Sequence, residues 1–374
     1  MIVTDITHLI ERAQSHLDEE NFEAARADFE AIIVQDGRLP EAFIGLGDCC
    51  FGLGEYGASE DAYRGVLEAV PSDPDALFGL AAVLRVTENY AEAVSLYERA
   101  FEAEPERTEA YWELAYAREM SGDKKGAEHA YKACLAHHPD HGMAAHLLAA
   151  MTGAKTRRAP ENYVRDLFDD YAETFDTDLV EDLNYVVPRL IEKTLTTHLP
   201  ASPFPGIPPF ARVLDLGCGT GLVSEAIRPL ALHITGIDLS SKMLDIAVSK
   251  NRIDKRIVSD MIDFLGPSNN NREIFDLVIC GDALVYLGDL KDIVKGVSHQ
   301  LNGGGVFCFT VEDLVGGDFA LLPTGRYAHD KAYVTDLLNN SKQAVLRTSA
   351  MVPRRDSDQE IAGRLFLSQY RSAS

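Results

Sequence analysis

The chain has 374 residues, of which 46% are hydrophobic and 25% charged, so it can form two or three globular domains with full cores. Its formal net charge is −24, and such an excess of negative charge repels phosphate backbones, which argues against nucleic acid as a partner. No apolar run approaches the roughly 20 residues that span a bilayer, and the N-terminus lacks the basic start and apolar stretch of a secretory signal, so we expect a cytoplasmic protein without a membrane partner.

The cysteines argue against a metal or redox site. All six are scattered along the chain, and none forms a CxxC pair. The sequence contains no HExxH motif and no cluster of cysteine and histidine. We therefore expect reduced thiols and no bound metal.

The negative charge is concentrated in the N-terminal part. Residues 1–153 carry a net charge of −18, whereas residues 154–374 carry −6. Two interpretations stay open: a solvated surface, or a docking face for a basic protein or peptide.

The N-terminal part repeats with a period of 34 residues. Three segments start at Pro40, Pro74 and Thr108, and residues 6–39 fit the same frame more loosely. Matching positions hold the same residue types: Leu46, Leu80 and Leu114; the small residues Gly47, Ala81 and Ala115; Tyr63, Tyr97 and Tyr131; Pro71, Pro105 and Pro139. These features predict helix–turn–helix units, because small residues let two helices approach closely, the tyrosine fills the space between units, and the proline ends the second helix.

This pattern resembles the tetratricopeptide (TPR) repeat family over four repeats, with residues 140–152 as a terminal capping helix. The resemblance implies an all-α solenoid with a concave groove. Three roles stay open for it: docking of a partner or substrate, self-association, and a structural scaffold.

A polar segment and two predicted helices follow the repeats. Residues 152–160, "TGAKTRRAP", are polar and end in proline, as is typical of a domain boundary. Helical spacing of apolar residues predicts a helix that contains Tyr163 and Tyr171, and a second helix near residues 184–197. The proline-rich residues 199–210 then form a tether to the next element.

A glycine-rich turn follows a predicted buried strand. The motif "VLDLGCGTG" (residues 213–221) places glycines at 217, 219 and 221, and a helix is predicted to begin after it. Glycines allow a tight turn and a close approach of the backbone to a ligand. Strand, glycine loop and helix form a nucleotide-binding turn, but the spacing GxGxG after Asp215 departs from the dinucleotide fingerprint.

Two acids stand at the ends of the next two predicted strands. "LHITGIDLS" contains Asp238, which can accept both hydroxyls of a ribose. "KRIVSD" ends in Asp260, which can accept a bond from an adenine amine. Further strands are predicted at 275–284 and 305–313, followed by a last antiparallel strand at 357–369 whose hairpin partner is 341–352.

From about residue 161 to the C-terminus, the chain resembles the class I S-adenosylmethionine (SAM) dependent methyltransferases. The resemblance rests on "VLDLGCGTG", "GIDLS", "VSDM", "FDLVICGDALVYLGDL" and "LNGGGVFCF", in which "LNGGG" replaces the family's usual "LkPGG". It implies a Rossmann-like α/β domain with a seven-stranded mixed sheet and helices on both faces. With the repeats in front, the chain resembles the bacterial predicted TPR-repeat methyltransferases. We predict a TPR domain at 1–153, a linker and helical lid at 154–210, and a SAM-binding core at 211–374.

The resemblance also implies which residues contact the cofactor, SAM. The glycine loop faces its methionine part, Asp238 its ribose, and Asp260 its adenine, against which Leu239 or Met243 packs. Tyr171 is either a lid contact or a core residue of an amphipathic helix. The full expected set is Tyr171, Asp215, Gly217, Cys218, Gly219, Asp238, Leu239, Met243, Asp260, Met261 and Gly281.

The transferred methyl group is already activated, so catalysis is mostly alignment of the acceptor in a site that excludes water. A base is needed only for an alcohol, a phenol or a protonated amine. The main candidates are Asp282, Tyr286 and His329, with Tyr163, Glu312 and Asp313 as further ones. We place His329 in a loop between the fifth strand and the next helix; a surface or helix-capping histidine is the alternative.

Three functions are compatible with the sequence. The first is a SAM-dependent methyltransferase acting on a small molecule or on a peptide or protein, with the repeats docking a partner or substrate or mediating self-association. The second is a non-catalytic TPR scaffold with a retained SAM-binding fold. A dehydrogenase is the third, and binding of NAD instead of SAM would distinguish it.

Overall fold

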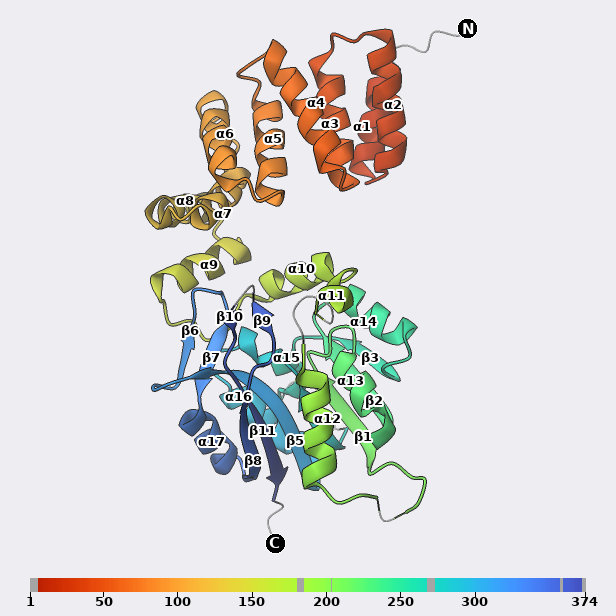
Figure 1. Ribbon diagram of the computed structural model, residues 1–374, viewed down its shortest axis with the longest axis vertical. Helices are drawn as coiled ribbons and strands as arrows, with labels where there is room; N and C mark the ends of the chain where they lie inside the picture. The colour runs from red at the N-terminus through yellow and green to blue at the C-terminus, as the bar shows by residue number, and fades with distance from the viewer. Residues whose placement is uncertain (1–5, 180–184, 203, 268–272, 357–358, 372–374) are drawn as a thin grey trace. The chain divides into compact units, whose positions relative to one another are not determined.

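The chain forms two compact units, Met1–Leu148 and Ala149–Ser374. The computed structural model (Figure 1) describes residues 6–179, 185–202, 204–267, 273–356 and 359–371. Residues 180–184 of the expected lid and 357–358 of the expected last strand lie outside the described residues. The division between the units falls inside the expected capping helix, and the predicted domain boundaries stay predictions.

The first unit consists of antiparallel helix pairs (Figure 1). Its helices are α1 (Ile6–Asp18), α2 (Phe22–Gln35), α3 (Pro40–Gly52), α4 (Tyr56–Ala69), α5 (Pro74–Val86), α6 (Tyr90–Ala103), α7 (Tyr111–Met120) and α8 (Lys124–His137), with a short 3-10 helix, η1 (Thr108–Ala110), before α7. Each expected proline stands two residues beyond the end of α4, α6 or α8, as proline cannot continue a helix.

The repeated tyrosines pack as the spacing predicts. Tyr63, Tyr97 and Tyr131 are each at most 2% exposed. A Cβ added to Gly47 in the same repeat would lie 2.7 Å from the Tyr63 ring, and one added to Gly79 in the next repeat only 2.4 Å from it. The ring therefore fills the space between two neighbouring repeats, and a Cβ at Gly47 or Gly79 would require it to shift.

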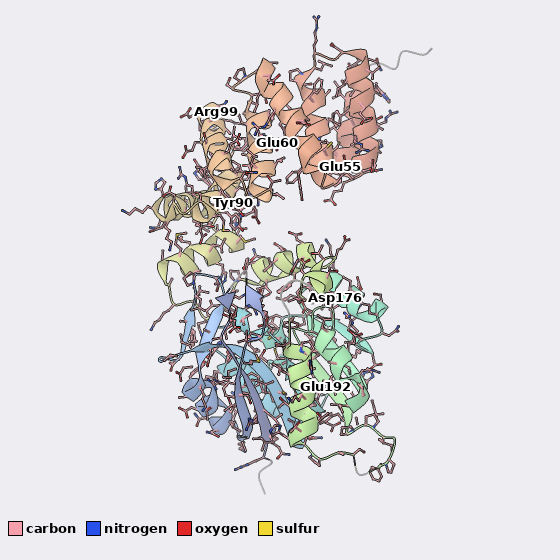
Figure 2. The ribbon with its side chains drawn as sticks, in the orientation of Figure 1. Glu55, Glu60, Tyr90, Arg99, Asp176 and Glu192 are labelled. Carbon is pink, nitrogen blue, oxygen red and sulfur yellow. The ribbon has the colours of Figure 1, made fainter. Side chains whose placement is uncertain are left out.

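Ion pairs also connect neighbouring repeats at the surface. Arg26 in α2 donates two hydrogen bonds of 3.0 Å to Glu55, which is labelled in Figure 2, and Arg64 in α4 lies 2.9 Å from Glu92 in α6. Within α4, Arg64 also lies 2.7 Å from Glu60, likewise labelled. Exposed pairs of this kind contribute little stability, so the buried small residues and tyrosines hold the array together.

The second unit is built on a twisted mixed sheet in the strand order β3-β2-β1-β4-β5-β11-β8. Strands β1 to β5 are parallel, and β11 runs antiparallel to both β5 and β8. The bounds are β1 (Phe210–Leu216), β2 (Ala231–Asp238), β3 (Lys255–Val258), β4 (Phe275–Cys280), β5 (Leu301–Leu314), β6 (Phe319–Leu321), β7 (Tyr327–Asp330), β8 (Gln343–Met351), β9 (Arg355–Asp356), β10 (Gln359–Glu360) and β11 (Gly363–Tyr370).

Helices cover both faces of this sheet (Figure 1). One buried cluster joins α12, α13 and α14 to the sheet, and a second joins α15, α16 and α17 to its other face. The helices of this unit are α10 (Glu161–Tyr171), α11 (Phe175–Thr177), α12 (Val187–His198), α13 (Leu222–Ile227), α14 (Ser241–Ser249), α15 (Met261–Leu265), α16 (Lys291–Gln300) and α17 (Lys331–Asn340), with 3-10 turns η3 (Arg228–Leu230) and η4 (Leu284–Tyr286). Helix α9 (Gly142–Thr152) is the expected capping helix.

Three details differ from the expected sheet. The last strand, β11, lies between β5 and β8, so its hairpin partner β8 is the edge strand. Strand β3 ends at Val258, and Asp260 is instead the N-cap of α15. The segment after β5 contains strands β6 and β7, and β7 pairs with the end of β5 in parallel. None of the helices described has the length and apolar character that crossing a membrane requires.

Candidate active site

A deep pocket lies at the carboxyl ends of β1, β2 and β4, where the order of strands reverses beside β1. Ligands of open α/β sheets bind at this kind of position, because neighbouring loops diverge there. The pocket is walled by the glycine loop after β1, the acids after β2 and β3, the turn after β4, and residues of α10 and α11.

The glycine loop adopts the conformation that its sequence requires. Gly217, Gly219 and Gly221 have φ values of +64°, +53° and +84°, a region in which a side chain is strained. A Cβ at Gly217 would lie 2.4 Å from that of Ala283. Above Gly219, by contrast, the nearest atom to an added Cβ is a ring carbon of Phe175 at 3.8 Å, so the loop presents backbone to open space beneath α11.

Asp215 lies at the base of the pocket and is 1% exposed. Its Oδ2 accepts a hydrogen bond of 2.6 Å from Ser224, while its Oδ1 is buried and has no partner among the described residues. Burial raises the pKa of Asp215 to about 7, although the bond from Ser224 opposes the shift. An unpaired buried carboxylate oxygen is costly unless a ligand supplies a donor or a positive charge.

Asp238 holds the glycine loop against the end of β2. Its Oδ2 accepts from the backbone N–H of Gly219 at 2.8 Å, and its Oδ1 accepts from that of Ser240 at 2.9 Å. Burial raises the pKa of Asp238, and these backbone bonds limit the rise. Each carboxylate oxygen of Asp238 can still accept a hydrogen bond from a ligand in the pocket.

Asp260 caps the helix after β3. Its Oδ1 accepts from the backbone N–H groups of Ile262 and Asp263 at 2.8 and 3.1 Å, and it lies 3.5 Å from Nη1 of Arg158. Carboxylate oxygens of Glu161, Asp260 and Asp263 lie within 4.8 Å of one another. Arg158 pairs with the first two of these acids, which accounts for their proximity without a metal ion.

The structure brings ten of the eleven expected cofactor residues to this one pocket. They are Tyr171, Asp215, Gly217, Cys218, Gly219, Asp238, Leu239, Asp260, Met261 and Gly281. The eleventh, Met243, is fully buried in α14 and is not among the lining residues. Of the two residues proposed for packing on adenine, Leu239 is thus the one that faces the pocket.

The helices over the pocket are held down by two carboxylates. Asp169 in α10 accepts a bond of 2.5 Å from Ser240. Asp176 in α11, labelled in Figure 2, accepts from Thr220, from Lys250 at 2.5 Å and from Arg252 at 2.6 Å. Although burial opposes ionisation, these three donors lower the pKa of Asp176 below its ordinary value. Helices α10 and α11, which belong to the predicted lid, are therefore attached to the glycine loop and to both ends of α14.

The turn after β4 carries two of the three candidate catalytic residues. Asp282 has φ +60°, an unusual value for a residue with a side chain, and its backbone N–H donates to Thr310 at 2.8 Å. Its carboxylate pairs with Arg354. Tyr286 packs edge-on against Phe168 with ring centres 5.5 Å apart, and burial raises the pKa of its hydroxyl. Both side chains line the pocket, and the tyrosine is suited to donate a hydrogen bond at neutral pH.

The expected position of His329 is wrong. The residue lies in strand β7, not in a loop, and it is fully buried outside the pocket lining. Its Nε2 donates to the carbonyls of Leu287 and Gly288 at 2.9 and 3.0 Å, and burial lowers the pKa of the imidazole to about 4. His329 is thus a neutral histidine that joins β7 to the chain after η4, and we do not propose it as a base.

The expected linker is also more than a spacer. Arg157 accepts through its carbonyl from the N–H groups of Gly288 and Asp289 at 2.8 and 3.0 Å, and Ala159 donates to Tyr286 at 2.9 Å. Residues 156–160 therefore form a strap along the chain that follows β4 and help to hold Tyr286 at the pocket.

Three arginines that the sequence did not single out line the same pocket, namely Arg158, Arg326 and Arg354. Arg326 precedes β7 and Arg354 follows β8, so both approach the turn after β4 from strands beyond β5 in the sheet. No motif or spacing marks either residue in the sequence.

The second unit is an α/β domain with a pocket at the carboxyl ends of its parallel strands. Residues 214–307 match the family described as methyltransferase domain. Residues 10–74, 51–100 and 87–151 match families described as tetratricopeptide repeat. The chain thus carries tetratricopeptide repeats followed by a methyltransferase domain, which confirms the predicted fold class.

Among curated proteins, the chain is similar to ubiquinone biosynthesis O-methyltransferases. The mitochondrial protein of Rattus norvegicus is 31% identical over 124 residues, which cover 32% of this chain and 35% of the relative. The protein of Bordetella pertussis is 30% identical over 157 residues, which cover 37% of this chain and 64% of the relative. The matches thus span less than two thirds of either relative.

Among solved structures, the chain is similar to the N-methyltransferase NodS from Bradyrhizobium japonicum WM9, in complex with S-adenosyl-L-homocysteine (SAH). The identity is 17% and the TM-score 0.43, over 56% of this chain and 99% of that one.

Proposed function

We propose that this protein is a SAM-dependent methyltransferase. The observation that carries the proposal is the single pocket that gathers the glycine loop, Asp215, Asp238 and Asp260 at the point where the strand order reverses. Along the chain, the glycine loop would supply backbone groups first, Asp238 after β2 would bind the ribose, and Asp260 after β3 would bind the adenine.

The residues present fit the cofactor. The unpaired Oδ1 of Asp215 would accept from the ammonium of the methionine part, and a positive charge there would relieve the cost of its burial. Asp238 would bind the ribose hydroxyls while it keeps its bonds to the loop. Leu239, Asp260 and Met261 would surround the adenine, with Oδ2 of Asp260 as the oxygen for its amine.

SAM, when bound, supplies a methyl group activated by a positively charged sulfur. The contribution of the chain is to position the acceptor and to exclude water, which α10 and α11 do by covering the glycine loop. Asp282 is the candidate base for an acceptor that must lose a proton, and Tyr286 is a candidate hydrogen-bond donor to it.

The acceptor proposed is a small molecule. Aromatic side chains of the lid and of η4 line the pocket, including Phe168, Tyr171, Phe175 and Tyr286, so the walls suit a flat apolar body. A peptide side chain reaching in from outside is the alternative. Curated relatives are named O-methyltransferases, and an oxygen acceptor is the one for which Asp282 would have a role.

A thermal shift experiment tests the proposal against the two other functions. A ligand that binds the native state stabilises it by RT ln(1 + [L]/Kd), about 2.7 kcal/mol at 100 times Kd. We expect SAH to raise the Tm and NAD to leave it unchanged. A response to NAD alone would identify a dehydrogenase, whereas a response to neither would leave a non-catalytic scaffold.

For the repeats, we propose docking of the acceptor or of a partner that carries it. Support comes from the concentration of charge, because the first unit carries −18 of the net −24. Docked species are then basic or neutral, and added salt weakens their binding. Tethering raises the effective concentration of a docked acceptor. Equal kcat/KM of the full chain and of the chain without repeats, at low acceptor concentration, would leave self-association or a scaffold role.

A further inference from the structure

Four charged side chains from separate parts of the chain meet beside the pocket. This charged cluster consists of Asp282 after β4, Glu312 in β5, Arg326 before β7 and Arg354 after β8. Arg354 lies at its centre with a side chain 5% exposed, and it donates through Nη1 to Asp282 and through Nη2 to Glu312 at 2.7 Å. Both acids therefore already have a cation as partner, inside the protein.

Arg326 differs from the other three members. Its Nη1 lies 3.8 Å from Asp282 and 3.7 Å from Glu312, which is beyond hydrogen-bond length. Within the described parts of the chain, no hydrogen bond from its guanidinium is found, and its side chain is 29% exposed and lines the pocket. The guanidinium thus offers its donors to a ligand in the pocket.

The position of Arg326 is fixed by its surroundings. Its carbonyl accepts from Leu322 at 2.8 Å, and Gly325 donates to Leu322 at 2.9 Å, so it stands on a tight turn between β6 and β7. Its guanidinium carbon lies 5.9 Å from the centre of the Tyr286 ring. A charge held by a turn and an aromatic ring loses little conformational freedom when it binds a ligand.

The charges of the cluster favour an anionic ligand over a cationic one. An amine approaching Asp282 would meet two guanidiniums, because Arg354 already occupies both acids. Burial also raises the pKa of Glu312, so ionisation of this carboxyl group is less favourable and the cluster is less negative. An anion, by contrast, would find a guanidinium whose two acidic neighbours lie at 3.7 and 3.8 Å, in ion-pair contact but beyond hydrogen-bond length, so that its hydrogen-bond donors are available.

The shape of the site indicates which chemical class of anion would bind. A guanidinium matches a planar carboxylate with two parallel hydrogen bonds. The ring of Tyr286 lies beside it, and Phe168 packs on that ring. Aromatic walls next to a fixed guanidinium suit an aromatic ring that bears a carboxylate.

Resting on the proposed function, we propose that the methyl acceptor is an aromatic carboxylate that also bears a hydroxyl group. Arg326 binds its carboxylate and its ring packs against Tyr286, while the hydroxyl oxygen receives the methyl group, SAH leaves, and the hydroxyl proton passes to Asp282. Arg326 is then the residue that selects the acceptor, and Arg354 is a positioning residue that holds Asp282 through Oδ2 and Glu312 through Oε1.

Calorimetry on the SAH-loaded full chain tests this inference with three probes of one shape. They are 2-naphthoate, its neutral carboxamide, and the cation 2-naphthylmethylammonium. We expect the carboxylate to bind at least tenfold more tightly than the carboxamide and the cation not to bind. Equal binding of carboxylate and carboxamide, preference for the cation, or binding of none of the three would overturn the inference.

Three variants test whether Arg326 causes the preference for the carboxylate. Arg326→Gln should abolish the preference for the carboxylate, whereas Arg326→Lys should retain part of it, because the charge remains but the two-bond geometry is lost. Arg347→Gln, which removes an exposed arginine of β8, should retain all of it. A preference that survives Arg326→Gln would assign the anion to another residue.

The same measurements separate this inference from the proposed function. SAH binding is measured first, for the wild type and for each variant. If the wild type does not bind SAH, the methyltransferase proposal fails; if it binds SAH without preferring the carboxylate, only the inference about the acceptor fails.

Discussion

Cofactor binding should depend on pH through Asp215. Burial raises its pKa to about 7 in the free protein, and its Oδ1 has no partner among the described residues. The shift from 3.8 corresponds to a cost of about 4 kcal/mol for the ionised carboxylate, at 1.36 kcal/mol per pKa unit. A ligand ammonium next to Oδ1 would favour the ionised form and lower this pKa again.

The sign of the effect follows from this linkage. Because the ligand binds the ionised form, affinity is full above pH 7 and is lost as the pH falls below it. With the pKa of Asp215 at about 7 in the free protein and far lower in the complex, the Kd for SAH should be about 25-fold higher at pH 5.5 than at pH 7.5. At pH 6, binding should release about 0.9 proton per SAH.

Isothermal titration calorimetry of SAH binding in two buffers of different ionisation enthalpy measures both quantities. Asp215→Asn should keep the bond from Ser224, bind SAH more weakly at pH 7.5, and show neither the pH dependence nor the proton release. Asp238→Asn is the control for the other pocket acid whose pKa is raised by desolvation. An affinity that is flat with pH in the wild type, or a pH dependence that persists in Asp215→Asn, would refute the reasoning.

Three further predictions concern the glycine loop, the predicted lid and helix α9. Asp238→Ala should weaken SAH binding by roughly 1.5–3 kcal/mol, because it removes a charged hydrogen-bond acceptor. It should also speed hydrogen exchange at the Gly219 N–H, which Asp238 binds. An unchanged SAH affinity by calorimetry contradicts the ribose assignment. Residues 161–198 should gain hydrogen-exchange protection when SAH binds, and Asp176→Ala, which releases α11 from Lys250 and Arg252, should reduce protection around 175–179; equal protection with and without SAH argues against a lid. A chain that starts at Lys155 should fold and bind SAH. Its free energy of unfolding should be about 1–2 kcal/mol lower than that of a chain that starts at Gly142, because it lacks the buried Ala149 and Ala150. Identical denaturation midpoints of the two chains would show that these contacts contribute nothing.

The elements of the two units could be predicted because their signals are local. Tyr63 and Gly47 lie within one repeat, so a fixed spacing in the sequence is enough to bring them together. The glycine loop and Asp215 belong to one strand–turn–helix unit, and its three glycines can adopt the positive φ values that the turn requires. Parallel strands then bring Asp238 and Gly281 to the same edge as the loop, as the strand order implies.

The wrong position of His329 has a non-local cause. Nothing in the residues around it indicates a strand, but β7 pairs with the last residues of β5, and Asp313 lies opposite His329. That pairing buries the imidazole and gives its Nε2 two carbonyl acceptors from the chain after η4. The segment is therefore a strand because it pairs with β5, although its own residues do not favour a strand.

The sequence by itself determined the helical repeats, the parallel sheet and the side of the pocket that we propose for the cofactor, because each depends on spacings within one short segment and on the period of helices and strands. Only the tertiary structure decided the acceptor side. Arg326, Arg354 and Asp282 are distant in the sequence, and they meet because β11 inserts between β5 and β8 while β6 and β7 extend the sheet at the end of β5. Their ion pairs depend on distances across several strands, which no local pattern of residues encodes.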